Sequence, residues 1–313
     1  MTLSLSRRDF IAGTLALAPT LQGALPKGRI VETNLHVYPL DTKRFPFHPN
    51  ATYTPAPAPL EPYLEFAKAA GVGPVVVTHP SPYQDDHRVL AYCFENEPSP
   101  GFFKGTCFFD PIDPKTPARM KELSRQHPGR IKALRIFEDR KVTDPPTTSG
   151  HFRDRDLKDA NVKIVWKAAG SLGMAIQMVP IPGHAPQIYA LASEIKDTTV
   201  IIDHLAAPTK GTPEEYEEVL KLGKLPNVIM KFTSLRGATK EEFPHKDLQA
   251  LSRRVFDAFG PDRMMWGTFG GNMAAYEKSV ALFDHLLAFA SEADKAKIRG
   301  LTALRVFDFK NLA

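Results

Sequence analysis

Short apolar runs alternate with longer amphipathic segments along most of the chain. Eight runs are rich in β-branched and other apolar residues, as buried strands are: 29–37, 74–79, 105–109, 131–137, 174–179, 199–204, 228–233 and 264–267. Segments between them, such as LEPYLEFAKAAG and TPEEYEEVLKLG, place apolar residues three and four positions apart and therefore predict helices. Several of these segments end on glycine, which is common after the last turn of a helix.

This alternation predicts a parallel sheet that is covered by helices. Eight strand–helix units, with no glycine-rich nucleotide-binding turn after the first strand, favour an α/β fold of the closed (β/α)8 TIM-barrel type over an open doubly wound sheet. Such barrels commonly exceed ~250 residues, so we expect a single domain over 25–313. The proline-rich segment NATYTPAPAPLEPY after the first strand predicts a long loop over the catalytic face.

The first 24 residues predict an export signal that precedes the barrel. Arg7 and Arg8 come before a weakly apolar run, 11–18, which is too short to span a bilayer. The arginine pair resembles a twin-arginine signal, an address for the export of folded proteins. We therefore expect a periplasmic protein whose export partner is the twin-arginine machinery. Contact with a membrane would come only from an uncleaved signal.

Composition excludes some classes of partner. The chain is 43% hydrophobic and 24% charged, and its formal net charge of +5 is scattered without a basic block. This pattern argues against nucleic-acid binding, so a small-molecule substrate is the expected partner. Cys93 and Cys107 have neither the number nor the spacing for a zinc site or a disulfide framework. We expect two isolated buried thiols, with a single disulfide between them as the alternative.

The first strand carries three polar residues at alternate positions, Glu32, Asn34 and His36. Side chains alternate between the faces of a strand, so these three are predicted to point into the barrel while Thr33 points out. Polar groups inside a closed core are costly unless they meet water, a metal, a substrate or one another. A functional site is favoured here, with a buried hydrogen-bonded network as the alternative.

The later strands end in polar residues that a barrel would bring to the same rim. These are His79 and Tyr83 after the second strand, Arg135 in the fourth, Gln177 in the fifth, Asp203 and His204 in the sixth, and Lys231 in the seventh. An arginine in an apolar strand needs an anionic partner, which could be a substrate carboxylate or a structural acid such as Glu32. Lys231 leaves the same two alternatives open. A histidine that closes an apolar strand points to chemistry.

Four segments in this order, VETNLHVY, VIIDHLAAP, NVIMKFTSL and DRMMWGTFGG, resemble the amidohydrolase-related superfamily of TIM-barrel hydrolases. The resemblance lies in the branch of sugar lactonases and pyrone-dicarboxylate lactonases, and it extends over 29–309. The family has an acid, a histidine and a histidine two residues apart in strand 1, but Asn34 stands where the first histidine belongs. His204 matches the family histidine after strand 6. The family aspartate after strand 8 falls on Phe269, and the strand 5 ligand of metal-dependent members falls near Gln177 or Met178.

These departures change what the resemblance implies about mechanism. A catalytic zinc usually takes three protein ligands, whereas only His36 and His204 remain as nitrogen donors, with Glu32 a possible third. We therefore predict no bound metal and no cofactor. The predicted reaction is hydrolysis of a small lactone, derived from a sugar acid or an aromatic breakdown product, with His36 or His204 as the base and Glu32 next. The predicted substrate-binding residues are Asn34, His79, Tyr83, Arg135, Gln177, Lys231 and Phe269.

A second hypothesis comes from a different class of function. Loss of the strand 8 acid and of one strand 1 histidine would also fit a catalytically retired barrel that binds a small molecule in the periplasm. A barrel fold alone does not decide between the two, because function depends on the site.

Overall fold

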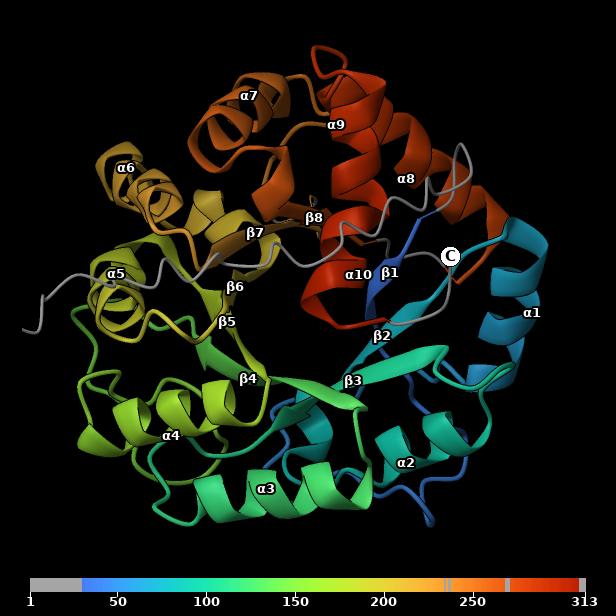
Figure 1. The fold of residues 1–313 in the computed structure, drawn as a ribbon, viewed down its shortest axis with the longest axis vertical. Helices are drawn as coiled ribbons and strands as arrows, with labels where there is room; N and C mark the ends of the chain where they lie inside the picture. Colours follow the sequence, from blue (N-terminus) through green and yellow to red (C-terminus); the bar gives the residue numbers. More distant parts are fainter. Residues whose placement is uncertain (1–29, 234, 236–237, 268–270, 310–313) are drawn as a thin grey trace, which may run out of the picture.

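A ring of eight parallel strands forms the centre of the molecule (Figure 1). The computed structural model describes residues 30–309 except 234, 236–237 and 268–270. The strands pair in chain order: β1 (Glu32–Leu35), β2 (Val75–Thr78), β3 (Phe103–Phe108), β4 (Ile131–Glu138), β5 (Ala175–Pro180), β6 (Val200–Ile202), β7 (Val228–Phe232) and β8 (Met264–Trp266). Every predicted strand is present, with shifted ends.

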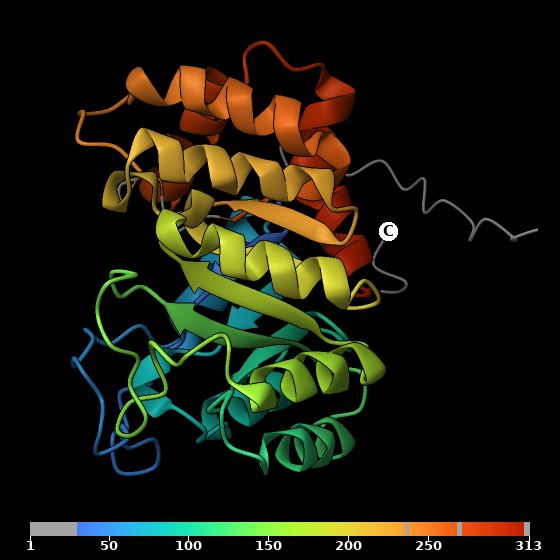
Figure 2. The same cartoon turned by 90° about the vertical axis from the view of Figure 1, so that its left-hand side faces the viewer.

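Helices surround this ring on its outer side (Figures 1 and 2). They are α1 (Leu60–Ala70), α2 (Arg88–Glu95), α3 (Thr116–Gln126), α4 (Ala160–Ser171), α5 (Ala185–Glu194), α6 (Pro213–Lys221), α7 (Asp247–Phe259) and α8 (Met273–Leu286). Two short helices follow, α9 (Glu292–Ala296) and α10 (Thr302–Val306), and α10 lies at one end of the barrel. Within the described residues, none of these helices has the length and apolar character needed to cross a membrane.

The first and last strands meet and almost close the ring. The Thr33 hydroxyl donates a hydrogen bond of 2.9 Å to the carbonyl oxygen of Trp266, at the end of β8. Glycine is required at the next position, because a Cβ on Gly267 would lie 2.5 Å from the Thr33 hydroxyl. The eight strands therefore form a nearly closed (β/α)8 barrel, which confirms the predicted TIM-barrel fold.

The barrel interior has an apolar layer and a polar layer. The apolar layer is a cluster of Val31, Val76, Ala133, Ala175, Ile201, Ile229 and Met265, together with Ala303 and Phe307 of the C-terminal segment. Two positions further along the same strands come Thr33, Thr78, Arg135, Gln177, Asp203 and Lys231, all buried. Because side chains alternate along a strand, this polar layer also points inward. Figure 2 shows α10 at one end of the barrel and the long loops at the other.

The loop after β1 packs on the end of the barrel where the polar layer lies. Tyr38 and Ala58 pair through both backbone hydrogen bonds and so close the base of the loop. The His48 backbone N–H donates to the carbonyl of Pro82, in the segment that follows β2. The loop therefore lies at the end of the barrel that the polar layer occupies, and its position over a catalytic face stays a prediction.

Two further predictions concern the thiols and the N-terminus. Cys93 and Cys107 are both free and buried, so the isolated-thiol alternative is confirmed. The export signal predicted for 1–24 lies outside the described residues and stays a prediction, which cell fractionation can test.

The apolar layer should carry much of the barrel's stability. We expect Phe307→Ala to lower the free energy of unfolding by about 3–5 kcal/mol, because it removes a fully buried ring from the layer. Urea unfolding followed by circular dichroism measures this change. Phe289→Ala is the matched control, since that ring is 39% exposed, and it should cost less than about 1–2 kcal/mol. Equal losses in the two variants would contradict the assignment of the layer.

Candidate active site

A buried carboxylate, Asp203, stands at the centre of the polar layer. The Gln177 side-chain amide donates a 2.8 Å hydrogen bond to Asp203 Oδ2. Lys231 Nζ lies 3.3 Å from Oδ1, and Arg135 Nη2 lies 3.6 Å from Oδ2. Burial alone would raise the pKa of Asp203, but its cationic neighbours, Lys231 foremost, hold the pKa below its ordinary value. Asp203 is therefore an ionised carboxylate shared by two cations.

The same contacts decide what Arg135 and Lys231 pair with. Arg135 also donates to the carbonyl oxygen of His79 at 3.2 Å, and its guanidinium lies 4.6 Å from the ring centre of Phe137. Lys231 Nζ donates to Asn34 Oδ1 at 2.9 Å. The sequence left a substrate carboxylate and a structural acid as alternatives. The structure provides the structural acid, and it is Asp203.

Strand β1 does not follow the simple alternation predicted for it. The pairing with β2 sets Glu32 against Val75 but Leu35 against Val77, so β1 has one extra residue there, a β-bulge. Val31 lies in the apolar layer, which turns Glu32 to the opposite face, where its charge raises the pKa of the buried Tyr63 hydroxyl after the larger effect of burial. The prediction that Glu32 shares one face with Asn34 and His36 is therefore wrong.

His36 is held as a neutral imidazole beside the polar layer. Its Nδ1 makes a 2.8 Å hydrogen bond with the carbonyl oxygen of Thr78. A carbonyl can only accept, so the proton of the neutral ring is on Nδ1. Burial lowers the pKa of His36 to about 3, and the nearby charges of Arg135 and Lys231 act in the same direction.

His204 begins a strained turn at the end of β6. His204, Leu205, Ala206 and Ala207 all have positive φ, between 48° and 57°, which is rare for residues other than glycine. The hydroxyl of Tyr216, on α6, donates to the Leu205 carbonyl at 3.1 Å and supports the turn. The turn leaves His204 partly buried. We interpret this local strain as the cost of placing its imidazole.

The imidazole of His204 is also neutral. Its Nδ1 lies 2.8 Å from the hydroxyl oxygen of Thr233, at the end of β7. Burial lowers the pKa of His204 to about 4, although the charge of Asp203 opposes this shift. At neutral pH the ring can therefore take up a proton from a reacting group.

His79 and Tyr83 belong to the segment that follows β2. The His79 ring is fully buried, bonds through Nε2 to the carbonyl of Gln84 at 2.8 Å, and stacks on His87 at 4.5 Å. Tyr83 is also buried, with its ring centre 5.1 Å from that of Phe47. Their role as substrate-binding residues stays a prediction. Phe269 lies outside the described residues.

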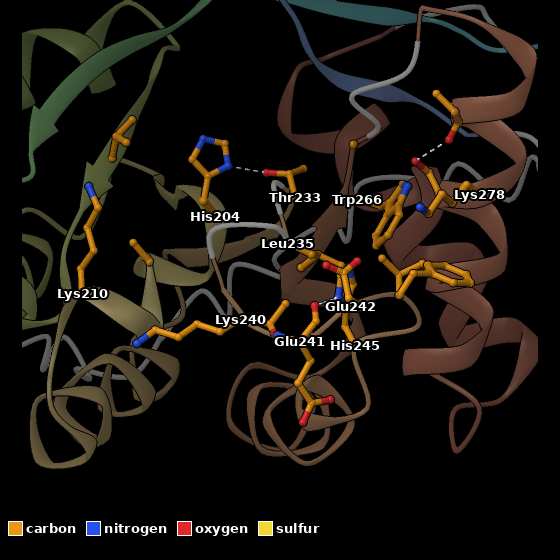
Figure 3. A pocket seen from close by; sticks show the side chains of 18 of the residues that line it. His204, Lys210, Thr233, Leu235, Lys240, Glu241, Glu242, His245, Trp266 and Lys278 are labelled. Atoms are coloured by element: carbon orange, nitrogen blue, oxygen red, sulfur yellow. Dashed lines mark hydrogen bonds between the residues drawn. The ribbon is translucent and has the colours of Figure 1, made fainter.

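A cavity of about 850 Å³ opens at the ends of β5 to β8 (Figure 3). His204 and Thr233 form part of its inner wall, and Lys210, Lys240 and Lys278 line its outer part. Figure 3 shows Lys210 and Lys240 on one side and Lys278 on the other.

The lysines of this cavity differ in whether a carboxylate of the chain pairs with their charge. Lys210 lies 3.7 Å from Asp139, whereas Lys240 forms no ion pair with any residue of the described part of the chain. Glu241 and Glu242 also line the cavity, but Glu241 is engaged as an acceptor of the Asp247 backbone N–H. Lys240 is therefore available to an anionic group that enters the cavity.

The residues that the structure describes offer no set of ligands that fits a resident metal ion. Over the described ranges, no three or more His, Cys, Asp or Glu side chains form a group that could hold one. The charges of Lys231 and Arg135 act on the imidazoles of both His36 and His204, and they would oppose a metal cation there. We therefore derive the chemistry from the chain's own side chains.

Two residues of the site, Asp203 and Thr233, had no role predicted from the sequence. In the sequence, Asp203 stands out only as a polar residue at the end of a strand. Its position two residues after the inward Ile201 is the signal that identifies it, once the apolar layer is known. Thr233 likewise lies two residues after Lys231 of β7. Its hydroxyl contacts the imidazole of His204.

The barrel, with its polar layer at the carboxyl ends of the strands, defines the class of the protein as a TIM-barrel protein with an enzyme-type site. A family model described as Amidohydrolase matches residues 32–309. The chain therefore belongs to the amidohydrolase family of hydrolases.

Individual relatives share less of the sequence. L-fucono-1,5-lactonase from Burkholderia ambifaria is 33% identical over 101 residues, which are 30% of this chain and 34% of that relative. The matched part is thus about a third of the relative's length. 4-Sulfomuconolactone hydrolase from Rhizobium radiobacter is 24% identical over 265 residues, 82% of this chain and 80% of that protein.

Solved structures share the fold. One is a putative 2-pyrone-4,6-dicarboxylic acid hydrolase from Pseudomonas putida, with a TM-score of 0.69, 20% identity, and coverage of 90% of this chain and 98% of that one. Another is an amidohydrolase from Burkholderia multivorans with bound zinc, with a TM-score of 0.67, 14% identity, and coverage of 90% and 99%.

The buried neutral histidines predict that acid destabilises the protein. The pKa values are lowered from 6.5 to about 3 for His36 and to about 4 for His79 and His204. Below about pH 6.5 the unfolded chain takes up these protons and the folded chain does not. Each histidine should then remove up to about 1.4 kcal/mol of unfolding free energy per pH unit, until the pH reaches its folded pKa.

Urea unfolding at about pH 7 and about pH 5 measures this loss. Burial raises the pKa of Glu138 to about 8 and also raises that of Asp154, which stabilises the fold as the pH falls, but the histidines with lowered pKa values, which include His87 and His151, are more numerous. His204→Gln should reduce the difference between the two pH values, and His285→Gln, at a partly exposed position on the outer helix α8, is the control. An unfolding free energy that is the same at both pH values would contradict the lowered pKa values.

Proposed function

We propose that this protein opens a small lactone that carries an anionic substituent, such as a carboxylate, without a resident metal ion. The observation that carries the proposal is the neutral imidazole of His204 in the wall of the cavity, beside the buried cations Arg135 and Lys231. The family membership supports hydrolysis. Lactones are named in the descriptions of both sequence relatives, and a pyrone dicarboxylic acid in that of one structural neighbour.

The proposed reaction uses His204 as the general base. Its neutral imidazole takes a proton from water, and the resulting hydroxide forms a bond to the lactone carbonyl carbon. The C–O bond of the ring then breaks, and the leaving oxygen receives the proton from the imidazolium. His36 is the alternative base, because its ring is also neutral at working pH.

The polar layer would stabilise the negative charge that develops on the carbonyl oxygen. Arg135 and Lys231 share the Asp203 carboxylate, so their fixed positive charges act on the floor of the site. A preorganised field of this kind in a site of low dielectric constant is a large contribution to catalysis. The lysines in the outer part of the cavity would hold the anionic substituent of the substrate.

His204→Gln tests the role of the base. With a panel of anionic and neutral lactones, we expect the wild type to hydrolyse at least one, and His204→Gln to lose about 10²–10⁴-fold in kcat, because general-base catalysis contributes that much. His285→Gln is the matched control, since His285 lies on the outer helix α8, and its rates should equal those of the wild type. Tight binding of lactones by the wild type with no turnover would reject the hydrolase and favour the binding-protein hypothesis.

Substitution of Lys240 and Lys210 tests whether the site prefers anionic lactones. Lys240→Gln combined with Lys210→Gln should raise KM for an anionic lactone by about tenfold, because each exposed charge pair contributes up to about 1 kcal/mol. The KM of a neutral lactone should not change. Lys224→Gln is the control, since Lys224 is exposed on the turn after α6. An equal rise for neutral and anionic lactones would show that the lysines do not recognise charge.

A further inference from the structure

The position of Lys231 does not suit a residue that contacts substrate. Its side chain is fully buried and is not part of the cavity wall. Nζ donates to Asn34 Oδ1 at 2.9 Å and lies 3.3 Å from Asp203 Oδ1. Both partners are acceptors, and a charged ammonium offers three donors, so the contacts match its protonated form.

The position of this ammonium within the barrel is informative. By the family resemblance of VETNLHVY, Asn34 stands in β1 where the first of two histidines is expected, and His36 keeps the second. The charge of Lys231 lowers the pKa values of both His36 and His204, so it acts on both imidazoles. The structurally similar amidohydrolase from Burkholderia multivorans is described as having bound zinc. Here the oxygen atoms of Asn34 and Asp203 contact an ammonium.

We propose that the Lys231 ammonium is a built-in cation that takes the place of a metal ion in this barrel, with Asn34 and Asp203 as its fixed acceptors. An ammonium at this position would repel a divalent ion, and its protons would occupy lone pairs that a metal needs. The proposal concerns only the centre of the barrel and does not depend on which substrate is hydrolysed.

The test exchanges the ammonium for a metal site. Four proteins are compared: the wild type, Asn34→His, Asn34→His/Lys231→Met, and Asn34→His/Lys224→Met, which removes an exposed lysine instead. Each is incubated with Zn²⁺ and passed through a desalting column, and zinc is measured by elemental analysis. Affinity is measured by competition with a chelating dye. We expect about one equivalent of Zn²⁺ only in Asn34→His/Lys231→Met, bound at least about 100-fold more tightly than in the other three.

Two results would overturn the proposal. One is zinc binding by the wild type or by Asn34→His as tight as that of the Lys231 double variant, because the ammonium then blocks nothing. The other is no binding by any folded variant, because removing the ammonium then opens no place for a cation. Circular dichroism verifies the fold. Asn34→His/Lys231→Gln serves as a second variant, since glutamine can still donate to Asp203. No substrate is used, so this outcome is separate from that of the lactone assays.

Discussion

The ionic centre formed by Asp203, Lys231 and Arg135 is the constraint on which the rest of the site depends. It joins β4, β6 and β7, and it reaches β5 through Gln177 and β1 through Asn34. Burying charges is costly, and apolar side chains of similar volume often stabilise a core equally well. Stability alone therefore does not account for this layer. The electrostatic potential that it creates at the open end of the barrel gives a better reason for its presence.

That potential helps to keep two histidines neutral. Cations below the imidazoles of His36 and His204 add to burial and keep both rings neutral. Each ring is oriented by a neighbouring strand, through the carbonyl of Thr78 on β2 and the hydroxyl of Thr233 at the end of β7. The strained turn at the end of β6 then brings His204, rather than an apolar residue, to the wall of the cavity.

Much of the architecture could be predicted from the sequence, because burial imposes a pattern on every strand. The eight apolar runs and the loop after β1 were predictable for that reason. The pairing of Lys231 and Arg135 with Asp203 was not, because the choice among acids depends on which strands are neighbours and on the inward register. Nothing in VETNLHVY indicates the bulge in β1. Because of this bulge, Glu32 does not share a face with Asn34 and His36. Two of the cavity lysines, Lys210 and Lys240, lie in connections between a strand and the following α-helix, whose course no periodicity encodes.

A lysine and a metal ion supply positive charge in different ways, and this difference constrains the mechanism. Zinc binds water and lowers its pKa to about 7, so the nucleophile forms on the metal. The buried ammonium of Lys231 donates to Asn34 and forms an ion pair with Asp203, and it cannot coordinate water in this way. In the proposed reaction water would therefore lose its proton to a side chain, for which the neutral imidazoles are the proposed acceptors. A reactive ester such as a lactone demands the least from such a base, which links the composition of the barrel centre to the proposed class of substrate.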